Sequence, residues 1–481
     1  MGLRFGTDGV RGPADELSDH FVLALGEAAA RTLLSSTSAQ GFVIGRDTRE
    51  SGTRIERALV AGLERGGASV SVLGVAPTPA VAWLAHRDSQ CAAVISASHN
   101  PWSDNGIKFF GVGGHKLSDE VEAELERLLD HLLAVHPAET VHQAETVIPA
   151  ETGLLGTSTG PADPDGLRAR DTAQHAGRFG DSPFDPRSAL NDWADSLRTN
   201  VSESLTGLHV VIDCANGAQS AIAADVIASL GARVDVLHAT PDGRNINAGC
   251  GSTHPADLQA AVTKNGADLG LAFDGDADRL LAVDEQGAIV DGDHLLALFA
   301  ADLHDRGALH GDIVVVTVMT NLGFRIAMER LGIQVIDTAV GDRYVLEALA
   351  RTGGSLGGEQ SGHIVFAEVA TTGDGLLSGL RLLDLLARSG RPFSELAAAS
   401  MTQLPQVLRN VSVGRRRSDI ADVLASQIAR EQALLGTEGR VLLRPSGTEP
   451  LIRVMVEAAT EQLAEAVAQR LVAAVEEVCS A

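Results

Sequence analysis

Short apolar, β-branched runs alternate with amphipathic helical patterns along most of this chain, and that alternation constrains the fold more than any other feature. Parallel strands need long crossover connections, usually helices, so this alternation predicts parallel sheets. The sequence therefore predicts the α/β class. The expected strands form three groups: residues 42–44, 70–73 and 92–95; residues 208–213, 234–237 and 269–273; and residues 313–318 and 333–338.

The chain has 481 residues, of which 44% are hydrophobic, and this is more than one ordinary core can support. Residues 144–186 break the pattern with many Pro, Gly, Thr, Asp and Ala residues, which is typical of a linker or surface insertion. Near the end, residues 440–443 and 451–457 are expected strands, and Leu463, Val467, Leu471 and Val475 share one face of a helix. We expect an N-terminal α/β domain (1–143), the linker (144–186), two more α/β domains (187–290 and 291–400) and a small α+β domain (401–481).

The charge of the chain excludes one class of partner. Lys and Arg total 38 against 63 Asp and Glu, giving a net charge of -25, so most of the surface would repel a nucleic-acid backbone. A phosphorylated sugar stays compatible, because only the lining of its cleft must be basic. The four cysteines have no metal or redox spacing, which suits a reducing compartment. Without an apolar run near 20 residues, no membrane association is expected, and a cytoplasmic location is predicted.

The first chemical motif is S-A-S-H-N-P, in the polar loop expected at residues 95–110, after a buried strand. Ligands of open α/β sheets bind at the carboxyl ends of strands, so Ser98 is a candidate nucleophile. Pairing of Ser98 with His99 as base is disfavoured, because consecutive side chains of an extended strand point to opposite faces. Lys108 is the better acid or base, since desolvation and a nearby cation would lower its pKa. The alternative is a polar turn that only ends the strand.

The second motif is D-G-D-A-D-R, again directly after an apolar run. Its three carboxylates, Asp274, Asp276 and Asp278, alternate and can converge on one hard cation, for which Mg²⁺ fits best. A calcium EF-hand loop is excluded because Arg279 stands where that loop needs Gly and residues 280–283 resemble a strand. A solvated acidic turn is the alternative, although three close carboxylates without a cation would repel one another.

Two further motifs complete the set. In G-G-E-Q-S-G-H, Glu359 can accept hydrogen bonds from sugar hydroxyls and His363 can hold a charge near a phosphate, although a plain glycine-rich turn is the alternative. In R-P-S-G-T-E-P, a glycine turn with hydroxyls and Arg444, followed by Arg453, is suited to bind phosphate. A tight hairpin is the alternative for this motif.

These motifs, together with F-G-T-D-G-V-R-G at the start, occur in the order and at about the spacing of the α-D-phosphohexomutases, and the chain resembles that family. Further stretches, D-N-G-I-K-F-F, C-G-S-T-H-P, T-V-M-T-N-L-G-F, A-V-G-D-R-Y and T-T-G-D-G-L-L, are similar to its bacterial branch that acts on glucosamine phosphates. The resemblance covers nearly the whole chain outside 144–186. It implies three α/β domains and a small C-terminal phosphate-binding domain around a central cleft.

The resemblance also implies a reaction and its residues. An enzyme of this kind interconverts glucosamine 6-phosphate and glucosamine 1-phosphate for cell-wall precursors, through a phosphoserine and a bisphosphate intermediate. It uses Mg²⁺ as its metal ion and either glucosamine 1,6-bisphosphate or glucose 1,6-bisphosphate as its activator. It also forms a homodimer. The implied residues are Ser98 as phosphoserine and metal ligand; Asp274, Asp276 and Asp278 on the metal; Arg11, Lys108, Arg279 and His363 around the reacting phosphoryl group; Gly341, Asp342, Arg343, Glu359 and Ser361 on the sugar; and Arg444, Ser446, Gly447, Thr448 and Arg453 on the other phosphate.

Three other functions were weighed. A phosphoglucomutase or phosphomannomutase is disfavoured by Gln360, where those relatives commonly have Met. A magnesium-dependent sugar phosphatase would leave the Arg444 motif unexplained, and a non-catalytic binder would not need Ser98 and Lys108. One residue departs from the family pattern: Ala277 replaces the usual Gly of D-G-D-G-D-R. Because a left-handed backbone costs an L-residue about 1–2 kcal/mol, an ordinary negative φ is predicted at Ala277.

Overall fold

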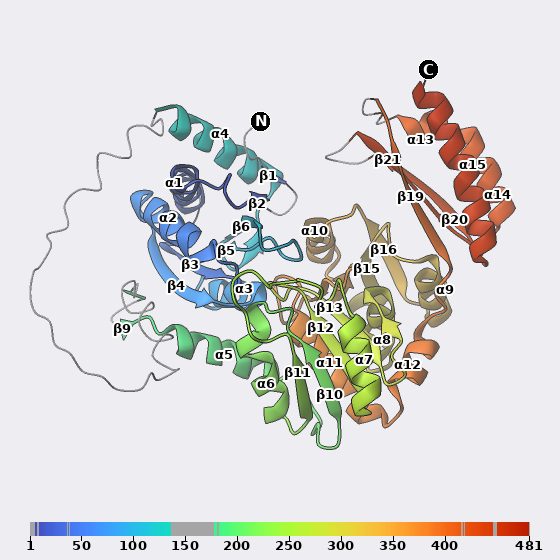
Figure 1. Cartoon of the computed structure of the whole chain (residues 1–481), viewed down its shortest axis with the longest axis horizontal. Coiled ribbons are helices and arrows are strands. Elements are labelled where there is room, and N and C mark those ends of the chain that lie inside the picture. The colour runs from blue at the N-terminus through green and yellow to red at the C-terminus, as the bar shows by residue number, and fades with distance from the viewer. Residues whose placement is uncertain are drawn as a thin grey trace, which may run out of the picture.

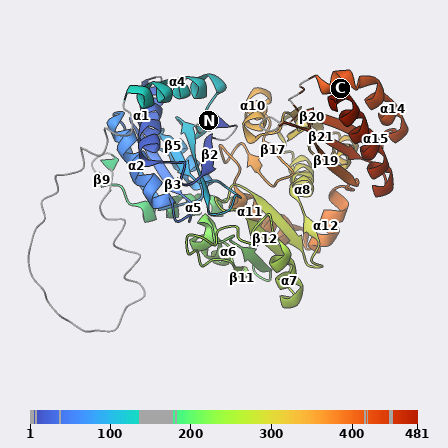
Figure 2. The same cartoon turned by 45° about the horizontal axis from the view of Figure 1, so that its top comes forward.

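A computed structural model describes the chain except residues 1–4, 7–8, 36, 38, 136–177, 180–181, 415–416, 418, 446–449 and 481. Besides a two-stranded pair, four larger sheets follow one another along the described chain, and the first and last of them lie at opposite ends of the molecule (Figures 1 and 2). The first three sheets are mixed with parallel centres, and the fourth is antiparallel. The predicted α/β class with a smaller C-terminal α+β domain is confirmed.

The first sheet has the order β1-β2-β6-β5-β3-β4, with β7 beside β6. Alternate residues of its central strands face two separate apolar clusters, because helices cover both sides. Its elements are β1 (Phe5–Gly6), β2 (Gly9–Pro13), α1 (Asp19–Ser35), β3 (Gly41–Arg46), α2 (Gly52–Arg65), β4 (Ser69–Val75), α3 (Thr78–Arg87), β5 (Cys91–Ile95), β6 (Asp104–Gly111), β7 (His115–Lys116) and α4 (Asp119–Val135).

The second and third sheets, β11-β10-β12-β13-β14 and β16-β15-β17-β18, repeat one arrangement of strands. The elements around the second are α5 (Pro186–Arg198), β10 (His209–Asp213), α6 (Ala223–Ser229), β11 (Arg233–Leu237), α7 (Ala256–Asn265), β12 (Leu269–Phe273), β13 (Leu280–Asp284) and β14 (Ile289–Val290). Those of the third are α8 (Gly292–Asp305), β15 (Ile313–Thr317), α9 (Leu322–Leu331), β16 (Gln334–Thr338), α10 (Asp342–Thr352), β17 (Leu356–Gly358), β18 (Ile364–Phe366), α11 (Gly375–Ser389) and α12 (Phe393–Ser400).

The first three sheets share a unit of four strands, which in chain order are β3, β4, β5 and β6; β10, β11, β12 and β13; and β15, β16, β17 and β18. In each unit the first strand lies between the second and the third, and the fourth pairs antiparallel with the third. The turn between the third and fourth strands therefore has the same place in all three domains. The Ser98, Asp274 and Glu359 motifs all occupy this turn, after β5, β12 and β17. This shared topology explains why three motifs that are far apart in sequence have equivalent positions.

Polar residues begin several of the helices at the sequence positions where strands end. The side chains of Asp291, Asn321 and Asp374 each accept a hydrogen bond from a backbone N–H in the first turn, of α8, α9 and α11 respectively. A cap of this kind stabilises a helix by about 1 kcal/mol. Gly390 then ends α11 in a left-handed conformation that suits glycine.

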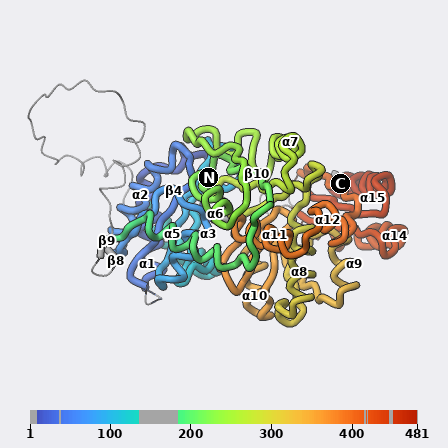
Figure 3. Tube along the Cα trace, turned by 90° about the horizontal axis from the view of Figure 1, so that it is seen from below, coloured from blue at the N-terminus to red at the C-terminus, as the bar shows by residue number. Residues whose placement is uncertain are grey.

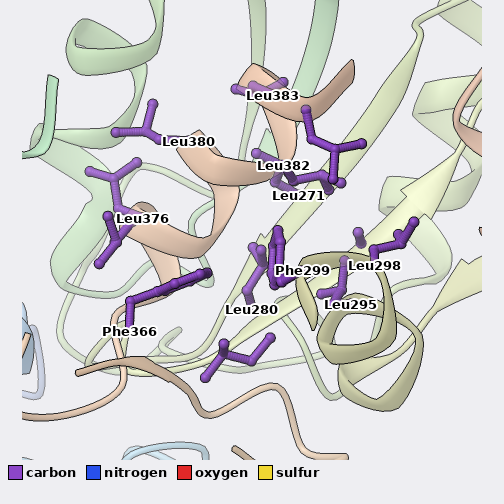
Figure 4. Close-up of a cluster of buried hydrophobic side chains, with 14 of the residues drawn as sticks. Leu271, Leu280, Leu295, Leu298, Phe299, Phe366, Leu376, Leu380, Leu382 and Leu383 are labelled. Carbon is purple, nitrogen blue, oxygen red and sulfur yellow. The ribbon is translucent and has the colours of Figure 1, made fainter. Parts of the chain in front are cut away.

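The second and third domains share one apolar core. Helix α11 belongs to the third domain in sequence but packs against β12 and β13 of the second, and Leu382 of this helix lies beside Leu271 of β12 (Figure 4). Phe299 and Phe366 extend the same cluster with an edge-to-face contact at 5.1 Å between ring centroids. These two domains are therefore held together by a continuous core.

The C-terminal domain is the antiparallel sheet β19-β21-β20 with helices on one side (Figure 1), and α14 and α15 lie at the opposite end of the molecule from the first domain (Figure 3). Val467, Leu471 and Val475 of α15 are buried as expected, but Leu463 is 36% exposed, and Ala464 takes its place in the core. Arg440 joins this domain to the third by donating to the carbonyls of Val318 and Thr320. Its elements are β19 (Gln406–Ser412), α13 (Ile420–Val423), α14 (Ala425–Leu435), β20 (Arg440–Pro445), β21 (Leu451–Glu457) and α15 (Glu461–Ser480).

Most of the expected linker at 144–186 lies outside the described residues. Its end is described from Arg178, where β8 (Arg178–Phe179) and β9 (Ser182–Pro183) pair before α5 begins. Within the described ranges, no helix combines the length and the apolar character that crossing a membrane requires.

Candidate functional site

Ser98 lies in the turn after β5, at the carboxyl end of the parallel strands, and is 2% exposed. Its φ is +51°, in the left-handed region that non-glycine residues seldom adopt. Such a conformation persists only where surrounding contacts impose it, and it is concentrated at functional sites. The Ser98 hydroxyl donates to Asp274 Oδ2 at 2.6 Å, so the first and second motifs meet.

The left-handed turn also changes the relation between Ser98 and His99. The argument from an extended strand was wrong here, because Ser98 Oγ and His99 Nδ1 are 3.4 Å apart. Burial, together with the charges of Arg279 and Arg11, lowers the pKa of His99 to about 4. The imidazole is therefore neutral and weakly basic near pH 7, so proximity does not make His99 an effective general base.

Lys108 lies on a strand, where the sequence analysis expected a loop. Residues 104–111 form β6, which pairs antiparallel with β5 and places Lys108 opposite Val94. The buried amine donates to Asp276 Oδ2 at 2.9 Å and to Asp278 Oδ2 at 3.2 Å. Two carboxylates therefore lie beside this nitrogen, and Lys108 forms ion pairs with the acidic motif.

The three aspartates of the second motif are buried, and one carboxylate oxygen from each lies within 4.8 Å of the others. Asp276 Oδ1 and Asp278 Oδ1 are buried and accept no hydrogen bond. Buried carboxylate oxygens without donors are costly, and hard cations take such oxygens as ligands. Asp274, Asp276 and Asp278 therefore fit a divalent cation with oxygen ligands.

The surroundings of the cluster shift the pKa values of two of its carboxylates in opposite directions. Burial, reinforced by the charges of Asp278 and Asp276, raises the pKa of Asp274 well above its usual range. Burial also raises the pKa of Asp278, but Lys108 and His363 outweigh that effect and hold its pKa well below the usual range. The charge of Arg279 and the hydrogen bond from Ser98 offset these effects at Asp274 only in part, and a bound cation would supply further positive charge.

The prediction for Ala277 was wrong, because its φ is +65°. The tight loop imposes this conformation: Ala277 N–H donates to the carbonyl of Asp274 at 3.1 Å, and its own carbonyl accepts from Gly375 N–H at 3.0 Å. The methyl group is completely buried. The loop thus needs the backbone that glycine favours, and this chain forms it with alanine.

We expect Ala277→Gly to change the free energy of unfolding by less than about 1 kcal/mol. Relief of about 1–2 kcal/mol of left-handed strain is offset by the lost burial of a methyl group, about 0.8 kcal/mol, and by the chain entropy of glycine, about 0.5–1 kcal/mol. Denaturant unfolding measures this difference. Because the strain is present with and without metal, the Mg²⁺ dependence of activity should not change, and a tenfold tighter requirement would contradict this account.

The third motif follows β17 and surrounds one carboxylate with donors. Gly341 N–H donates to Glu359 Oε1 at 3.0 Å, and the Ser361 hydroxyl donates to Glu359 Oε2 at 3.2 Å. His363 is buried with its Nδ1 3.7 Å from Asp278 Oδ2, so this motif reaches the acidic cluster. Burial lowers the pKa of His363, but Asp278 and Asp342 outweigh it and raise the pKa overall.

Asp342 and Arg343, at the start of α10, contact the first domain. Lys116 Nζ lies 2.9 Å from Asp342 Oδ2. The guanidinium of Arg343 is paired with Asp119 and Glu122 of α4. In this arrangement Arg343 joins the first and third domains.

Two further cations face the Ser98 turn. Arg279 Nη1 lies 3.3 Å from His99 Nδ1, and Arg279 Nε lies 3.8 Å from Asp278 Oδ1. Arg11 lies on β2 opposite Gly106 of β6, and its charge acts on His99. Positive charge is therefore concentrated around the Ser98 hydroxyl within a strongly acidic protein.

The fourth motif falls partly outside the described residues, since Ser446, Gly447 and Thr448 are not among them. Arg444 and Arg453 are directly opposite each other on β20 and β21. Burial and the charge of Arg453 lower the pKa of Arg444, whose Nε is buried without a hydrogen-bond partner. Two adjacent guanidiniums repel each other unless an anion lies between them, so this pair is suited to phosphate.

Two residues that contact the site were not predicted from the sequence. Thr78, three residues after β4, donates to Asp276 Oδ2 at 2.7 Å, and Asn247 Nδ2 donates to the carbonyl of Ser98 at 2.8 Å. Thr78 follows the carboxyl end of a strand, and that position was the available signal. Asn247 lies in an irregular loop, where the sequence offered no comparable signal.

Comparisons with known proteins agree with this fold. Models of the phosphoglucomutase/phosphomannomutase family match along the chain: alpha/beta/alpha domains I, II and III match residues 2–134, 191–287 and 291–404, and the C-terminal domain matches residues 405–474. The chain belongs to this family. Membership makes it an isomerase that moves a phosphoryl group within a hexose phosphate.

Particular relatives match over their full lengths. The phosphoglucosamine mutase of Desulforudis audaxviator is 48% identical over 99% of both chains, and that of Frankia alni is 49% identical over 98% of this chain and 97% of its own. A Burkholderia thailandensis family member has a similar structure, with a TM-score of 0.74 and 22% identity over 98% of this chain and 97% of its own. The N-acetylphosphoglucosamine mutase of Aspergillus fumigatus, solved with GlcNAc-6P and magnesium, is also similar in structure. Its TM-score is 0.65, with 19% identity over 100% of this chain and 96% of its own. At these identities the structural likeness shows the fold.

Proposed function

We propose that this enzyme is a phosphoglucosamine mutase that interconverts glucosamine 6-phosphate and glucosamine 1-phosphate. The observation that carries the chemistry is the buried Ser98 hydroxyl, 2.6 Å from one of three clustered aspartates and next to His99, on which the charges of two arginines act. The choice of amino sugar is supported by the full-length relatives named phosphoglucosamine mutase. It is also supported by Gln360, the residue that disfavoured glucose and mannose phosphates.

In the proposed mechanism Ser98 carries the phosphoryl group between two half-reactions. A sugar hydroxyl attacks phosphorus, the bond from phosphorus to Ser98 Oγ breaks, and the proton lost by the attacking hydroxyl is balanced by the proton gained by Ser98. The bisphosphate turns within the cleft and returns its other phosphate to Ser98. Lys108, Arg11, Arg279 and His363 offset the charge of the phosphoryl group during each transfer.

The acidic cluster would hold Mg²⁺ in this mechanism, with Asp274, Asp276, Asp278 and the oxygens of phosphorylated Ser98 as ligands. The bound cation would neutralise negative charge on the transferring phosphoryl group. Magnesium accompanies the Aspergillus fumigatus enzyme in its solved complex, which supports this choice. The buried Oδ1 atoms of Asp276 and Asp278, which accept no hydrogen bond from the described residues, support it independently.

The remaining roles follow the division into domains. Glu359, Ser361 and the Gly341–Arg343 segment are proposed to contact the sugar, and the Arg444 motif with Arg453 to bind the non-reacting phosphate. Glucosamine 1,6-bisphosphate or glucose 1,6-bisphosphate is the proposed activator, and an N-acetylphosphoglucosamine mutase variant has been solved with the latter. The homodimer, the cytoplasmic location and the domain limits 1–143, 187–290, 291–400 and 401–481 stay predictions.

A substrate comparison tests the proposed function. The full chain would be assayed with Mg²⁺ and a trace of glucose 1,6-bisphosphate on glucosamine 6-phosphate, glucose 6-phosphate and mannose 6-phosphate. The highest kcat/KM is expected for glucosamine 6-phosphate. Preference for either other sugar would contradict the proposed substrate, and release of inorganic phosphate without isomerisation would favour the phosphatase.

Arg453→Ala should raise KM for the sugar phosphates in both directions of reaction by about 10- to 100-fold. It removes a charge-assisted hydrogen bond, worth about 1.5–3 kcal/mol, to whichever phosphate is not reacting. Steady-state kinetics in each direction measure this loss. The control is Arg409→Ala on the neighbouring β19, whose exposed side chain pairs with Glu465. An effect in only one direction would show that Arg453 binds just one orientation of the sugar.

A further inference from the structure

Arg49 follows β3 at the edge of the first sheet where the Ser98 turn lies. Its side chain is completely buried and is among the largest such side chains of the described chain. A guanidinium without access to water is costly unless all its donors are satisfied. The groups that satisfy Arg49 therefore indicate its role.

Those groups are the backbone carbonyls of the turn that carries Ser98. Arg49 Nη2 donates to the carbonyls of Ser98 at 3.0 Å and Asn100 at 2.9 Å. Arg49 Nη1 donates to the carbonyl of Asp104 at 3.0 Å and to that of Pro101. One planar side chain thus holds both ends of the connection between β5 and β6.

The amide side of Ser98 is held through a second chain of contacts that also ends at Arg49. Ser98 N–H donates to Ser96 Oγ at 2.9 Å, and the Ser96 hydroxyl donates to Asp47 Oδ2 at 2.6 Å. Arg49 Nε donates to the same carboxylate oxygen at 2.9 Å. Both peptide groups of Ser98 are therefore fixed, which accounts for its left-handed φ of +51°.

The alternate residues of this segment face the second domain. The Thr48 hydroxyl donates to the carbonyl of Asn216 at 2.6 Å, and Glu50 N–H donates to the carbonyl of Gly243 at 2.9 Å. Asn247, also of the second domain, donates to the Ser98 carbonyl that Arg49 holds. The segment from Asp47 to Glu50 thus connects the Ser98 turn to the domain that carries the aspartates.

We propose that Arg49 is a positioning residue for phosphoryl transfer at Ser98. It holds the Ser98 peptide so that Oγ faces Asp274, and it acts through the backbone without touching the phosphoryl group. This inference rests on the proposed function, because it assigns Arg49 to the reaction of Ser98. Displacement of a reacting group by about 1 Å can cost about 100-fold in rate. Loss of the hydrogen bonds from the Arg49 guanidinium should therefore lower the rate of phosphoryl transfer at Ser98.

The experiment follows phosphorylation of the dephosphorylated full-length enzyme by glucose 1,6-bisphosphate, using intact mass and peptide mapping. Arg49→Lys keeps the charge but cannot reach all these carbonyls, so its phosphorylation of Ser98 should be about 10- to 100-fold slower, with KM for glucosamine 6-phosphate within about twofold of wild type. The matched control is Arg54→Lys on α2. Arg54 donates to the carbonyls of Leu17 and Ala14 and not to those that Arg49 holds, and this variant should react at the wild-type rate.

Asn247→Gly provides a second test in which the backbone conformation of the site is expected to be preserved. Asn247 has a φ of +56°, which glycine adopts freely, and the change removes only its donors to the turn. Slower phosphorylation of Ser98 in this variant, with an unchanged melting temperature, supports positioning of the turn through its carbonyls. Wild-type rates in both Arg49→Lys and Asn247→Gly would overturn the inference alone, whereas a wild-type enzyme that is never phosphorylated at Ser98 would overturn the proposed function with it.

Discussion

Ser98→Ala is expected to lower mutase activity by on the order of 10⁴-fold or more while the fold persists, since no other group can carry the phosphoryl between half-reactions. The change removes one hydrogen bond to Asp274, so the free energy of unfolding should fall by only about 1 kcal/mol. Activity with saturating bisphosphate, together with denaturant unfolding, measures both effects. Phosphopeptide mapping of wild type should place the modification on Ser98 and not on Ser96.

The matched control for this prediction is Ser89→Ala. Ser89 has the same φ of +51° as Ser98 but lies exposed in the turn after α3, so this variant reproduces the backbone strain without the chemistry. It should retain full activity. Substantial turnover by Ser98→Ala, or phosphate on another residue, would show that the phosphoryl group takes a different route.

Lys108→Met is expected to lower kcat by about 10²- to 10⁴-fold, the range typical of a lost acid–base or charge-stabilising group. The same change should reduce the free energy of unfolding by about 3–5 kcal/mol without metal, because it leaves the buried carboxylates of Asp276 and Asp278 without their cation. Addition of Mg²⁺ should recover part of that stability, since a bound cation would again neutralise these oxygens. Chemical denaturation with and without Mg²⁺ measures this recovery.

Lys264→Met serves as the control, because Lys264 is exposed near the end of α7, before β12 begins, whereas the acidic motif follows the other end of that strand. Neither its activity nor its stability should change appreciably. If Lys108→Met kept its stability in the absence of metal, the ion pairs of Lys108 with the aspartates would not matter for folding. If it kept full activity, Lys108 would have no role in the transfer.

Some misreadings of the site share one physical cause. From sequence, the residues before Lys108 resemble a loop because Pro, Ser, Asp, Asn and Gly favour turns. In the structure β6 gains its hydrogen bonds from β2 and β5, and such pairing between distant segments overrides local preference. The left-handed turns at Ser98 and Ala277 were missed for a related reason, because contacts from other loops impose them.

The sequence by itself determined the class of fold, the order of the motifs and the chemistry that each can perform. Strand and helix periodicity reflects local burial, and the carboxylates, hydroxyl and guanidiniums of a motif are present wherever the chain places them. Only the tertiary structure decided which groups meet. It brought Ser98 against Asp274 and Lys108 against Asp276, paired Arg343 with α4, and placed Arg49 beneath the Ser98 turn, because these contacts join residues whose approach depends on the packing of whole sheets and domains.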